Sequence, residues 1–151
     1  MNQQNTPSDY FPDEIFKAYD VRGIVDSALT TTITRKIGQA FGSEARSRGV
    51  DSVIIARDGR LSGPALSSAL SEGLRASGCD VIDVGMVPTP TLYFATYELG
   101  TGTGIMITGS HNPPEYNGLK MVMAGETLAG ERIQELKQRI LTEQYSTGAG
   151  A

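Results

Sequence analysis

Ser110 is the residue with the clearest capacity for chemistry, because of the loop that holds it. It follows Gly109 and is soon followed by the tandem prolines Pro113 and Pro114, directly after the apolar run 104–108. The glycine permits a backbone conformation that other residues resist, and the prolines exclude both a helix and a strand ladder. A hydroxyl on such a loop is exposed and restrained, so it could act as a nucleophile or carry a phosphoryl group. A plain turn explains the same residue types.

Two familiar serine chemistries fit this loop poorly. A nucleophile elbow needs Gly-x-Ser-x-Gly, whereas Ser110 has a glycine immediately before it and Asn112 two places after it. A hydrolase triad needs a histidine that reaches the serine and is oriented by an acid. His111 is the only histidine of the sequence, and adjacent residues rarely place their side chains in that relation. We interpret His111 as a donor to a phosphate or a sugar hydroxyl; the alternative is a loop histidine without a role.

Two cations could serve a phosphoryl group on Ser110. Lys120 begins a predicted strand that could return beside the loop, where it could balance phosphate charge or move a proton. Arg22 lies in an earlier polar loop and could bind phosphate. The alternatives are a solvated lysine and an arginine in a surface ion pair. A third polar loop, 57–62, is interpreted as a structural turn whose Ser62 caps the next helix.

The spacing of apolar residues predicts the elements that hold these loops. Intervals of three and four predict helices, and short apolar runs predict buried strands. The predicted helices span 30–49, 62–78, 91–99 and 131–141, and the predicted strands lie within 16–25 and over 53–56, 80–84, 104–108 and 119–122. This alternation predicts a three-layer α/β/α sandwich with a mixed, mostly parallel sheet, whose last two strands pair antiparallel. The polar loops follow strands, which is where open α/β sheets place their chemistry.

Length and composition bound the kind of protein. The chain has 151 residues, of which 39% are hydrophobic, and a net charge of −4. These values suit one domain and argue against binding to nucleic acid or to a membrane surface. The sequence shows neither a membrane span nor a signal peptide, so we expect a cytoplasmic protein with its single cysteine, Cys79, buried. We expect a flexible tail over 1–13, one domain over 14–145 and a linker or truncated end over 146–151.

Other phosphate and metal motifs are incomplete in the sequence. Gly100, Gly102 and Gly104 precede a strand rather than follow one, so they do not form a dinucleotide fingerprint. No P-loop pattern and no Asp-x-Asp-x-Asp run occurs. The chain is therefore expected to lack a complete hard-metal site of its own.

Four segments, in order, resemble the α-D-phosphohexomutases. The segment 107–120, ITGSHNPPEYNGLK, closely resembles the phosphoserine loop of that family and looks most like its phosphomannomutase/phosphoglucomutase branch. Segments 16–24 (FKAYDVRGI), 57–62 (RDGRLS) and 85–90 (GMVPTP) resemble three further family segments. The resemblance runs over about 16–137, nearly the whole chain, and is to the first domain of the family.

The resemblance implies a particular chemistry. Ser110 would carry a phosphoryl group that passes to a mannose or glucose phosphate. The resulting hexose 1,6-bisphosphate would turn in the site, so that 1-phosphate and 6-phosphate sugars interconvert. Mg²⁺ would bind a phosphate oxygen on Ser110, with its other ligands outside this chain. The implied catalytic residues are Ser110, Lys120 (for proton transfer) and His111, and the implied substrate-binding residues are Tyr19, Arg22 and Asn112.

The resemblance also implies partners. Family members have four domains, so the expected partners are a phosphosugar and domains two to four of the same protein. We therefore expect the isolated domain to fold without catalysing. A stand-alone module that binds phosphosugars or a partner protein is the alternative function. A serine hydrolase is a further alternative, and a fluorophosphonate probe would label a hydrolase but not a phosphoserine carrier.

Overall fold

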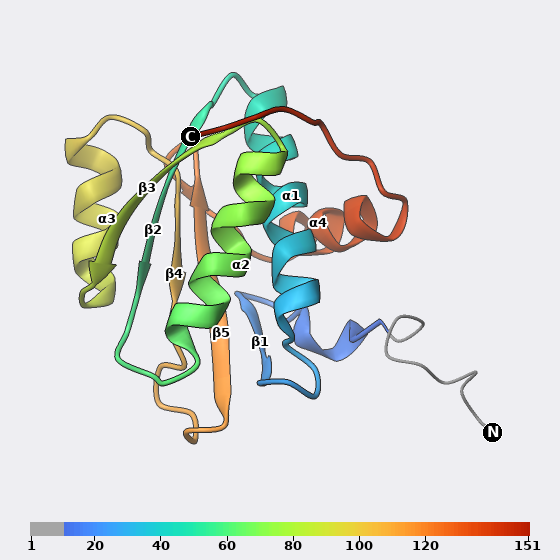
Figure 1. Cartoon of the computed structure of the whole chain (residues 1–151), viewed down its shortest axis with the longest axis vertical. Helices are drawn as coiled ribbons and strands as arrows, with labels where there is room; N and C mark the ends of the chain where they lie inside the picture. Colours follow the sequence, from blue (N-terminus) through green and yellow to red (C-terminus); the bar gives the residue numbers. More distant parts are fainter. Residues whose placement is uncertain (1–10) are drawn as a thin grey trace.

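Strands and helices alternate through residues 11–151, which the computed structural model describes (Figure 1). The strands are β1 (Val21–Ile24), β2 (Ser52–Arg57), β3 (Asp80–Met86), β4 (Gly104–Ile107), β5 (Tyr116–Met123) and β6 (Glu126–Thr127). The helices are the 3-10 helix η3 (Asp13–Ile15) and the α-helices α1 (Thr31–Ser47), α2 (Gly63–Ala76), α3 (Thr89–Glu98) and α4 (Glu131–Leu141). The tail expected over 1–13 lies outside the described residues except at positions 11–13. Within the described range, no helix is long and apolar enough to cross a membrane.

One mixed sheet joins the strands in the order β1-β5-β4-β2-β3, and β6 pairs with β5. β2 is parallel to both β3 and β4. β5 is antiparallel to β1, β4 and β6. It follows that β5 runs against the other described strands, which share one direction. The mixed, mostly parallel sheet is confirmed, and so is the antiparallel pairing of its last two predicted strands, which are β4 and β5.

Alternation along the strands divides the apolar core between the two faces of the sheet. Val53 and Ile55 of β2 join the larger core, to which α1, α2 and α4 contribute. Ile54 and Ala56 point the other way and form a smaller core with α3 and with Met106 of β4. Figure 1 shows α1 and α2 on one side of the sheet and α3 beside the other. The three-layer α/β/α sandwich is therefore confirmed.

Helices α1 and α2 approach each other through glycines. A Cβ on Gly38 of α1 would lie 2.5 Å from the carbonyl oxygen of Leu70 in α2. A Cβ on Gly73 of α2 would lie 2.0 Å from the carbonyl oxygen of Arg35 in α1. The two backbones therefore touch where side chains would otherwise separate them. Cys79, just after α2, is buried in the same core, as predicted.

The C-terminal segment 146–151 is hydrogen-bonded along its length. The backbone N–H of Ser146 donates to Ser43 Oγ over 2.8 Å, and its hydroxyl donates to the carbonyl oxygen of Ser77 over 2.7 Å. Farther on, the N–H of Gly150 donates to the last turn of α2 over 2.9 Å, and the final carbonyl accepts from the backbone of β3 over 3.1 Å. These bonds hold the segment against the C-terminal ends of α1 and α2 and the first residues of β3. Its assignment as a linker or truncated end stays a prediction.

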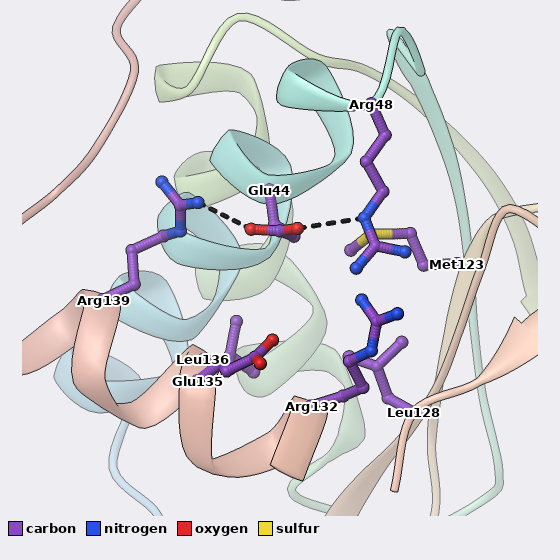
Figure 2. A pocket seen from close by; sticks show the side chains of 8 residues that line it. All are labelled: Glu44, Arg48, Met123, Leu128, Arg132, Glu135, Leu136 and Arg139. Atoms are coloured by element: carbon purple, nitrogen blue, oxygen red, sulfur yellow. Dashed lines mark hydrogen bonds and ion pairs between the residues drawn. The ribbon is translucent and has the colours of Figure 1, made fainter.

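Glu44 of α1 bonds two arginines, Arg139 and Arg48 (Figure 2). Its carboxylate oxygens accept from Arg139 of α4 over 2.6 Å and from Arg48, the residue that follows α1, over 2.9 Å. These side chains and Met123 line a cavity between α1, α4 and the end of β5. Met123 lies near the first residue of β4, whereas Ser110 follows the last one, so this cavity is separate from the Ser110 loop.

Glu44→Gln is expected to reduce the loss of stability that the protein shows in acid. Burial by itself raises the pKa of Glu44, but the hydrogen bonds from Arg139 and Arg48 outweigh it, so the pKa lies below its ordinary value. A carboxylate with a lowered folded pKa stabilises the fold above the ordinary glutamate pKa of about 4.3, and this stabilisation is lost as the pH falls through the folded value.

Urea unfolding at neutral pH and well below pH 4 measures this effect. We expect Glu44→Gln to cost at most about 1 kcal/mol at neutral pH, because the group is partly solvated, and less in acid. Glu72→Gln is the matched control, since the Glu72–Arg35 ion pair is exposed on both sides. Parallel pH profiles for the wild type and Glu44→Gln would contradict the prediction.

Candidate active site

Two polar loops lie side by side at the carboxyl edge of the sheet. The Ser110 loop connects β4 to β5, and the loop that begins at Asp58 follows β2. Because β2 and β4 are parallel neighbours, both loops emerge at the same edge. The N–H of Asp58 donates to the carbonyl oxygen of Ile107 over 2.9 Å, which ties the two loops together at their bases.

Ser110 sits in a turn that is bonded to itself. Its φ of 54° is a left-handed value, which is uncommon for a residue other than glycine. Its N–H donates to Thr108 Oγ1 over 3.0 Å, and the backbone and side-chain amides of Asn112 both donate to the carbonyl oxygen of Gly109 over 2.9 and 3.0 Å. Ser110 is half-buried, and its hydroxyl has no hydrogen-bond partner among residues 11–151. That oxygen is therefore free to bond an external group.

Arg60 reaches across from the neighbouring loop and binds the backbone of the Ser110 loop. Its side chain is only 17% exposed. Its guanidinium donates to four backbone carbonyl oxygens, those of Asn112 (2.7 Å), Pro113 (2.7 Å), Tyr116 (3.1 Å) and Ser110 (3.2 Å). The residue types around Arg60 predict only a structural turn, and nothing local in the sequence indicates this role.

Asp58 holds the same two loops from the other side. One carboxylate oxygen accepts from the N–H of Gly109 over 3.0 Å, and the other accepts from the N–H of Arg60 over 3.1 Å. The carboxylate also lies 3.6 Å from Arg60 Nε. Asp58 is the second residue whose part in the loop the sequence analysis missed.

The sheet register places Arg22 and Lys120 on one face near the base of the Ser110 loop. Arg22 of β1 lies opposite Gly118 of β5, and the N–H of Thr108 donates to the carbonyl oxygen of the same Gly118 over 2.9 Å. Lys120 lies opposite Met106 of β4. Arg22 and Lys120 thus lie on the face of the sheet against which α3 packs. Lys120 is one strand away from β4, and Arg22 is two strands away. At about 4.8 Å per strand, Arg22 is about 10 Å from the base of the loop.

Arg22, Tyr19 and His111 differ in how the fold holds their side chains. Arg22 forms an ion pair with the buried carboxylate of Asp20, yet its Nε is buried without a partner in the described part of the chain. Burying a donor without a partner costs free energy that a bound acceptor would recover. Tyr19 is 77% exposed, and His111 is also exposed, next to Ser110. The structure therefore gathers Ser110, His111 and Asn112 in one loop, and the roles predicted for them stay predictions.

Ser62 and Asn117 show a further difference from the sequence-based interpretation. The Ser62 side chain makes no capping hydrogen bond at the start of α2. Instead its hydroxyl accepts from the side-chain amide of Asn117 over 2.8 Å, and Asn117 is completely buried. The cap prediction for Ser62 is wrong, because its backbone is already helical (φ −76°, ψ −11°) and not extended as at a capping serine, and its hydroxyl bonds a buried amide at the start of β5 instead. This contact is another link between the two loops.

A family described as "Phosphoglucomutase/phosphomannomutase, alpha/beta/alpha domain I" matches residues 13–147. The chain belongs to the phosphoglucomutase/phosphomannomutase family. This confirms the resemblance that the four segments carry, and it identifies the α/β/α sandwich as domain I of that family. The match covers both the loop with Ser110 and the loop with Arg60.

Named relatives agree with the phosphoglucomutase/phosphomannomutase assignment. The chain is 54% identical over 140 residues to a "Phosphomannomutase/phosphoglucomutase" of Pseudomonas aeruginosa, covering 93% of this chain and 30% of that protein. It is 54% identical over 149 residues to a "Phosphoglucomutase" of Neisseria gonorrhoeae, covering 90% of this chain and 32% of that protein. A crystal structure of a phosphoglucomutase/phosphomannomutase family protein from Burkholderia thailandensis superposes with a TM-score of 0.90 at 51% identity, covering 94% of this chain and 33% of that one. The chain thus spans about a third of the length of these relatives.

Proposed function

We propose that this domain carries the phosphoserine of a phosphomannomutase/phosphoglucomutase, and that Ser110 is the residue that is phosphorylated. The observation that carries the proposal is the hydroxyl of Ser110, which is free of hydrogen bonds to described residues while the backbone around it is held by Arg60 and Asp58. Phosphoryl transfer depends mainly on positioning and charge stabilisation, so a restrained and unbonded hydroxyl is the arrangement it needs.

In the proposed reaction, a hydroxyl oxygen of a mannose or glucose monophosphate attacks the phosphorus on Ser110. The bond between phosphorus and Ser110 Oγ breaks, and Ser110 Oγ takes up a proton from water to become a hydroxyl again. The proton of the attacking hydroxyl passes to a base, for which Lys120 is our candidate. The hexose 1,6-bisphosphate formed in this way returns its other phosphate to Ser110 after turning in the site. The net result is the interconversion of hexose 1-phosphate and hexose 6-phosphate.

The charges near the loop support an anion on Ser110. A phosphoserine carries a charge of roughly −1.5 to −2 near neutral pH, so it needs cations and donors around it. Arg22 and Lys120 lie on the adjoining face of the sheet, and the unpartnered Nε of Arg22 is a donor in need of an acceptor. We assign Arg22, Tyr19 and Asn112 to substrate binding and His111 to a place beside the phosphoryl group.

Mg²⁺ remains a proposal for which this chain supplies few ligands. Residues 11–151 contain no group of three or more His, Cys, Asp or Glu side chains that could hold a metal ion. Asp58, the carboxylate bonded to the Ser110 loop, is already occupied by Gly109 and Arg60. The described residues therefore do not form a metal site by themselves. Only a phosphate oxygen on Ser110 would contribute, and the step above is not routed through the ion.

A chimera tests the proposal. This chain replaces the corresponding third of the Pseudomonas aeruginosa phosphomannomutase/phosphoglucomutase, to which it is 54% identical. Conversion of glucose 1-phosphate is then measured with Mg²⁺ and glucose 1,6-bisphosphate. We expect activity within about tenfold of the parent, because the loop and its supports would be in place. A chimera that folds but has no mutase activity would overturn the proposal.

The chain by itself should give no measurable turnover in the same assay. The Ser110 loop lies at the carboxyl edge of the sheet, and residues 11–151 hold no complete metal site. The chain by itself therefore does not enclose a substrate or exclude water from it. The measurement is conversion of glucose 1-phosphate by the purified chain at high protein concentration. A rate comparable to that of the chimera would contradict this prediction.

A further inference from the structure

We propose that Arg60 is a positioning residue, and that the planar guanidinium of Arg60 sets the conformation of the Ser110 loop. Gly109 is required because the absence of a side chain there lets this guanidinium lie against the loop. The inference deepens the proposed function, because the positioned loop is the one that would present the phosphoryl group. It concerns the loop backbone, however, and can be tested on the protein without phosphate or substrate.

The carbonyl oxygens of the loop converge on one guanidinium. Arg60 Nη1 donates to the carbonyls of Pro113 and Tyr116, and Nη2 donates to those of Ser110 and Asn112. Four carbonyls from a seven-residue stretch therefore point inward to one side chain. This stretch contains two prolines and forms no regular ladder before β5 begins at Tyr116, so Arg60 supplies donors to carbonyls that a strand partner would otherwise bond.

Gly109 and Arg60 are matched in shape. A Cβ at position 109 would lie 2.0 Å from Arg60 Nε and 2.1 Å from its Cζ, which is far inside van der Waals contact. Glycine at 109 thus lets the guanidinium pack flat on the loop backbone, and the following residue, Ser110, takes up the left-handed conformation. Any side chain at position 109 would push the fork away from the carbonyls.

Asp58 fixes the direction from which Arg60 approaches. Its carboxylate accepts from the N–H of Arg60 and from the N–H of Gly109, over 3.1 and 3.0 Å, and lies 3.6 Å from Arg60 Nε. An N–H of the Ser110 loop is therefore bonded to the carboxylate of Asp58, and the carbonyl oxygens of the loop are bonded to the guanidinium of Arg60. Within residues 11–151, the hydrogen bonds and the ion pair of the guanidinium go to backbone carbonyls and to Asp58, so Arg60 acts on Ser110 through the loop.

The planar shape of arginine, beyond its charge, is what this arrangement uses. A guanidinium presents five donors in one plane, whereas the ammonium of lysine is a compact point charge with three donors. Arg60→Lys keeps the charge but cannot reach four carbonyls spread over seven residues. Arg60→Met removes the charge while keeping an unbranched chain. If geometry is decisive, the two substitutions have the same effect.

Residue-resolved amide hydrogen exchange on the unphosphorylated chain tests the inference. The reporters are the amides of Gly109, Ser110, Asn112 and Tyr116, which are all bonded within the loop or to Asp58. We expect Arg60→Lys, Arg60→Met and Gly109→Ala each to speed exchange of these amides by at least about tenfold relative to amides in β2. The double variant Arg60→Lys/Gly109→Ala should be no faster than either single one, because both remove the same contact.

Matched controls lie close by. Gly59→Ala changes the neighbouring glycine, whose added Cβ would only reach Met86 Sδ at 3.7 Å, and Arg35→Lys changes an arginine bonded to an exposed carboxylate. Both should leave the loop amides unchanged. The ratio of loop to β2 exchange keeps the test informative for a destabilised variant, because a global effect speeds both sets together.

Two results would overturn the inference. One is wild-type protection of the loop amides in Arg60→Lys, which would show that a positive charge at position 60 is sufficient to hold the loop. The other is acceleration of the β2 amides to the same extent as the loop amides, which would reduce Arg60 to a general stabilising residue. Neither result bears on whether Ser110 is phosphorylated, and an inactive chimera would leave the exchange result standing.

Discussion

Ser110→Ala in the chimera is expected to abolish the interconversion of glucose 1-phosphate and glucose 6-phosphate. The alanine has no oxygen to bond phosphorus, so neither half of the proposed reaction can occur. Because the group that forms the covalent intermediate is lost, we expect the rate to fall by at least about four orders of magnitude, to background. Intact mass should show one phosphatase-sensitive phosphoryl group on the parent chimera and none on the variant.

The fold of this variant should be intact, since the Ser110 hydroxyl has no hydrogen-bond partner among the described residues, and the N–H of residue 110 can still donate to Thr108 Oγ1. Ser68→Ala is the matched control, because Ser68 is exposed on α2 and belongs to neither of the two loops. It should keep full activity and the same phosphoryl mass. A Ser110→Ala chimera that still turns over substrate, or still carries the phosphoryl group, would refute the assignment of Ser110.

Local sequence signals were sufficient to predict the three layers of the fold and the irregular loop that holds Ser110. Val53 to Ala56 is a continuous apolar run because β2 is covered on both faces, and such a run is visible without any tertiary knowledge. The tandem prolines after Ser110 exclude regular structure from the sequence alone. The antiparallel pairing of β4 and β5 follows because too few residues separate them for a helical crossover.

The supports of the loop could not be predicted in the same way. Arg60 lies 50 to 56 positions before the carbonyls that it binds, and nothing local indicates which backbone acceptors a side chain will meet. The sequence around Ser62 satisfies the rule for a helix cap, but the buried amide of Asn117, 55 positions later, takes its hydroxyl. Only the register of β2 against β4 brings these partners together.

The packing of Gly150, in the segment 146–151, could not be predicted either. The small residues of this segment are typical of a flexible linker, yet Gly150 is small because it lies against another backbone. A Cβ there would be 1.8 Å from the carbonyl oxygen of Cys79. Composition cannot distinguish a glycine that is free from one that is tightly packed, since both are read as the same letter.

Gly73→Ala is expected to destabilise the domain by about 3 kcal/mol, although the same change in an exposed helix is stabilising. Alanine is favoured over glycine inside a helix by roughly 0.5–1 kcal/mol. At position 73, however, the new Cβ would lie 2.0 Å from the carbonyl oxygen of Arg35 and 2.9 Å from the amide nitrogen of Gln39. Both contacts are to the backbone of α1, so no side-chain rotation relieves them, and the helices must separate.

Separation of α1 from α2 would loosen the larger core, because both helices contribute to it on the same face of the sheet. A loss of about 3 kcal/mol is a large share of the 5–15 kcal/mol that holds a typical domain together. Urea unfolding of the chain measures it, with Ser68→Ala on the exposed side of the same helix as the control, expected to lie within about 0.5 kcal/mol of the wild type. Gly38→Ala, on the facing helix, should be destabilising for the same reason, since its Cβ would lie 2.5 Å from the carbonyl oxygen of Leu70. If Gly73→Ala were as stable as the wild type, the backbones of α1 and α2 could not be in contact at this position.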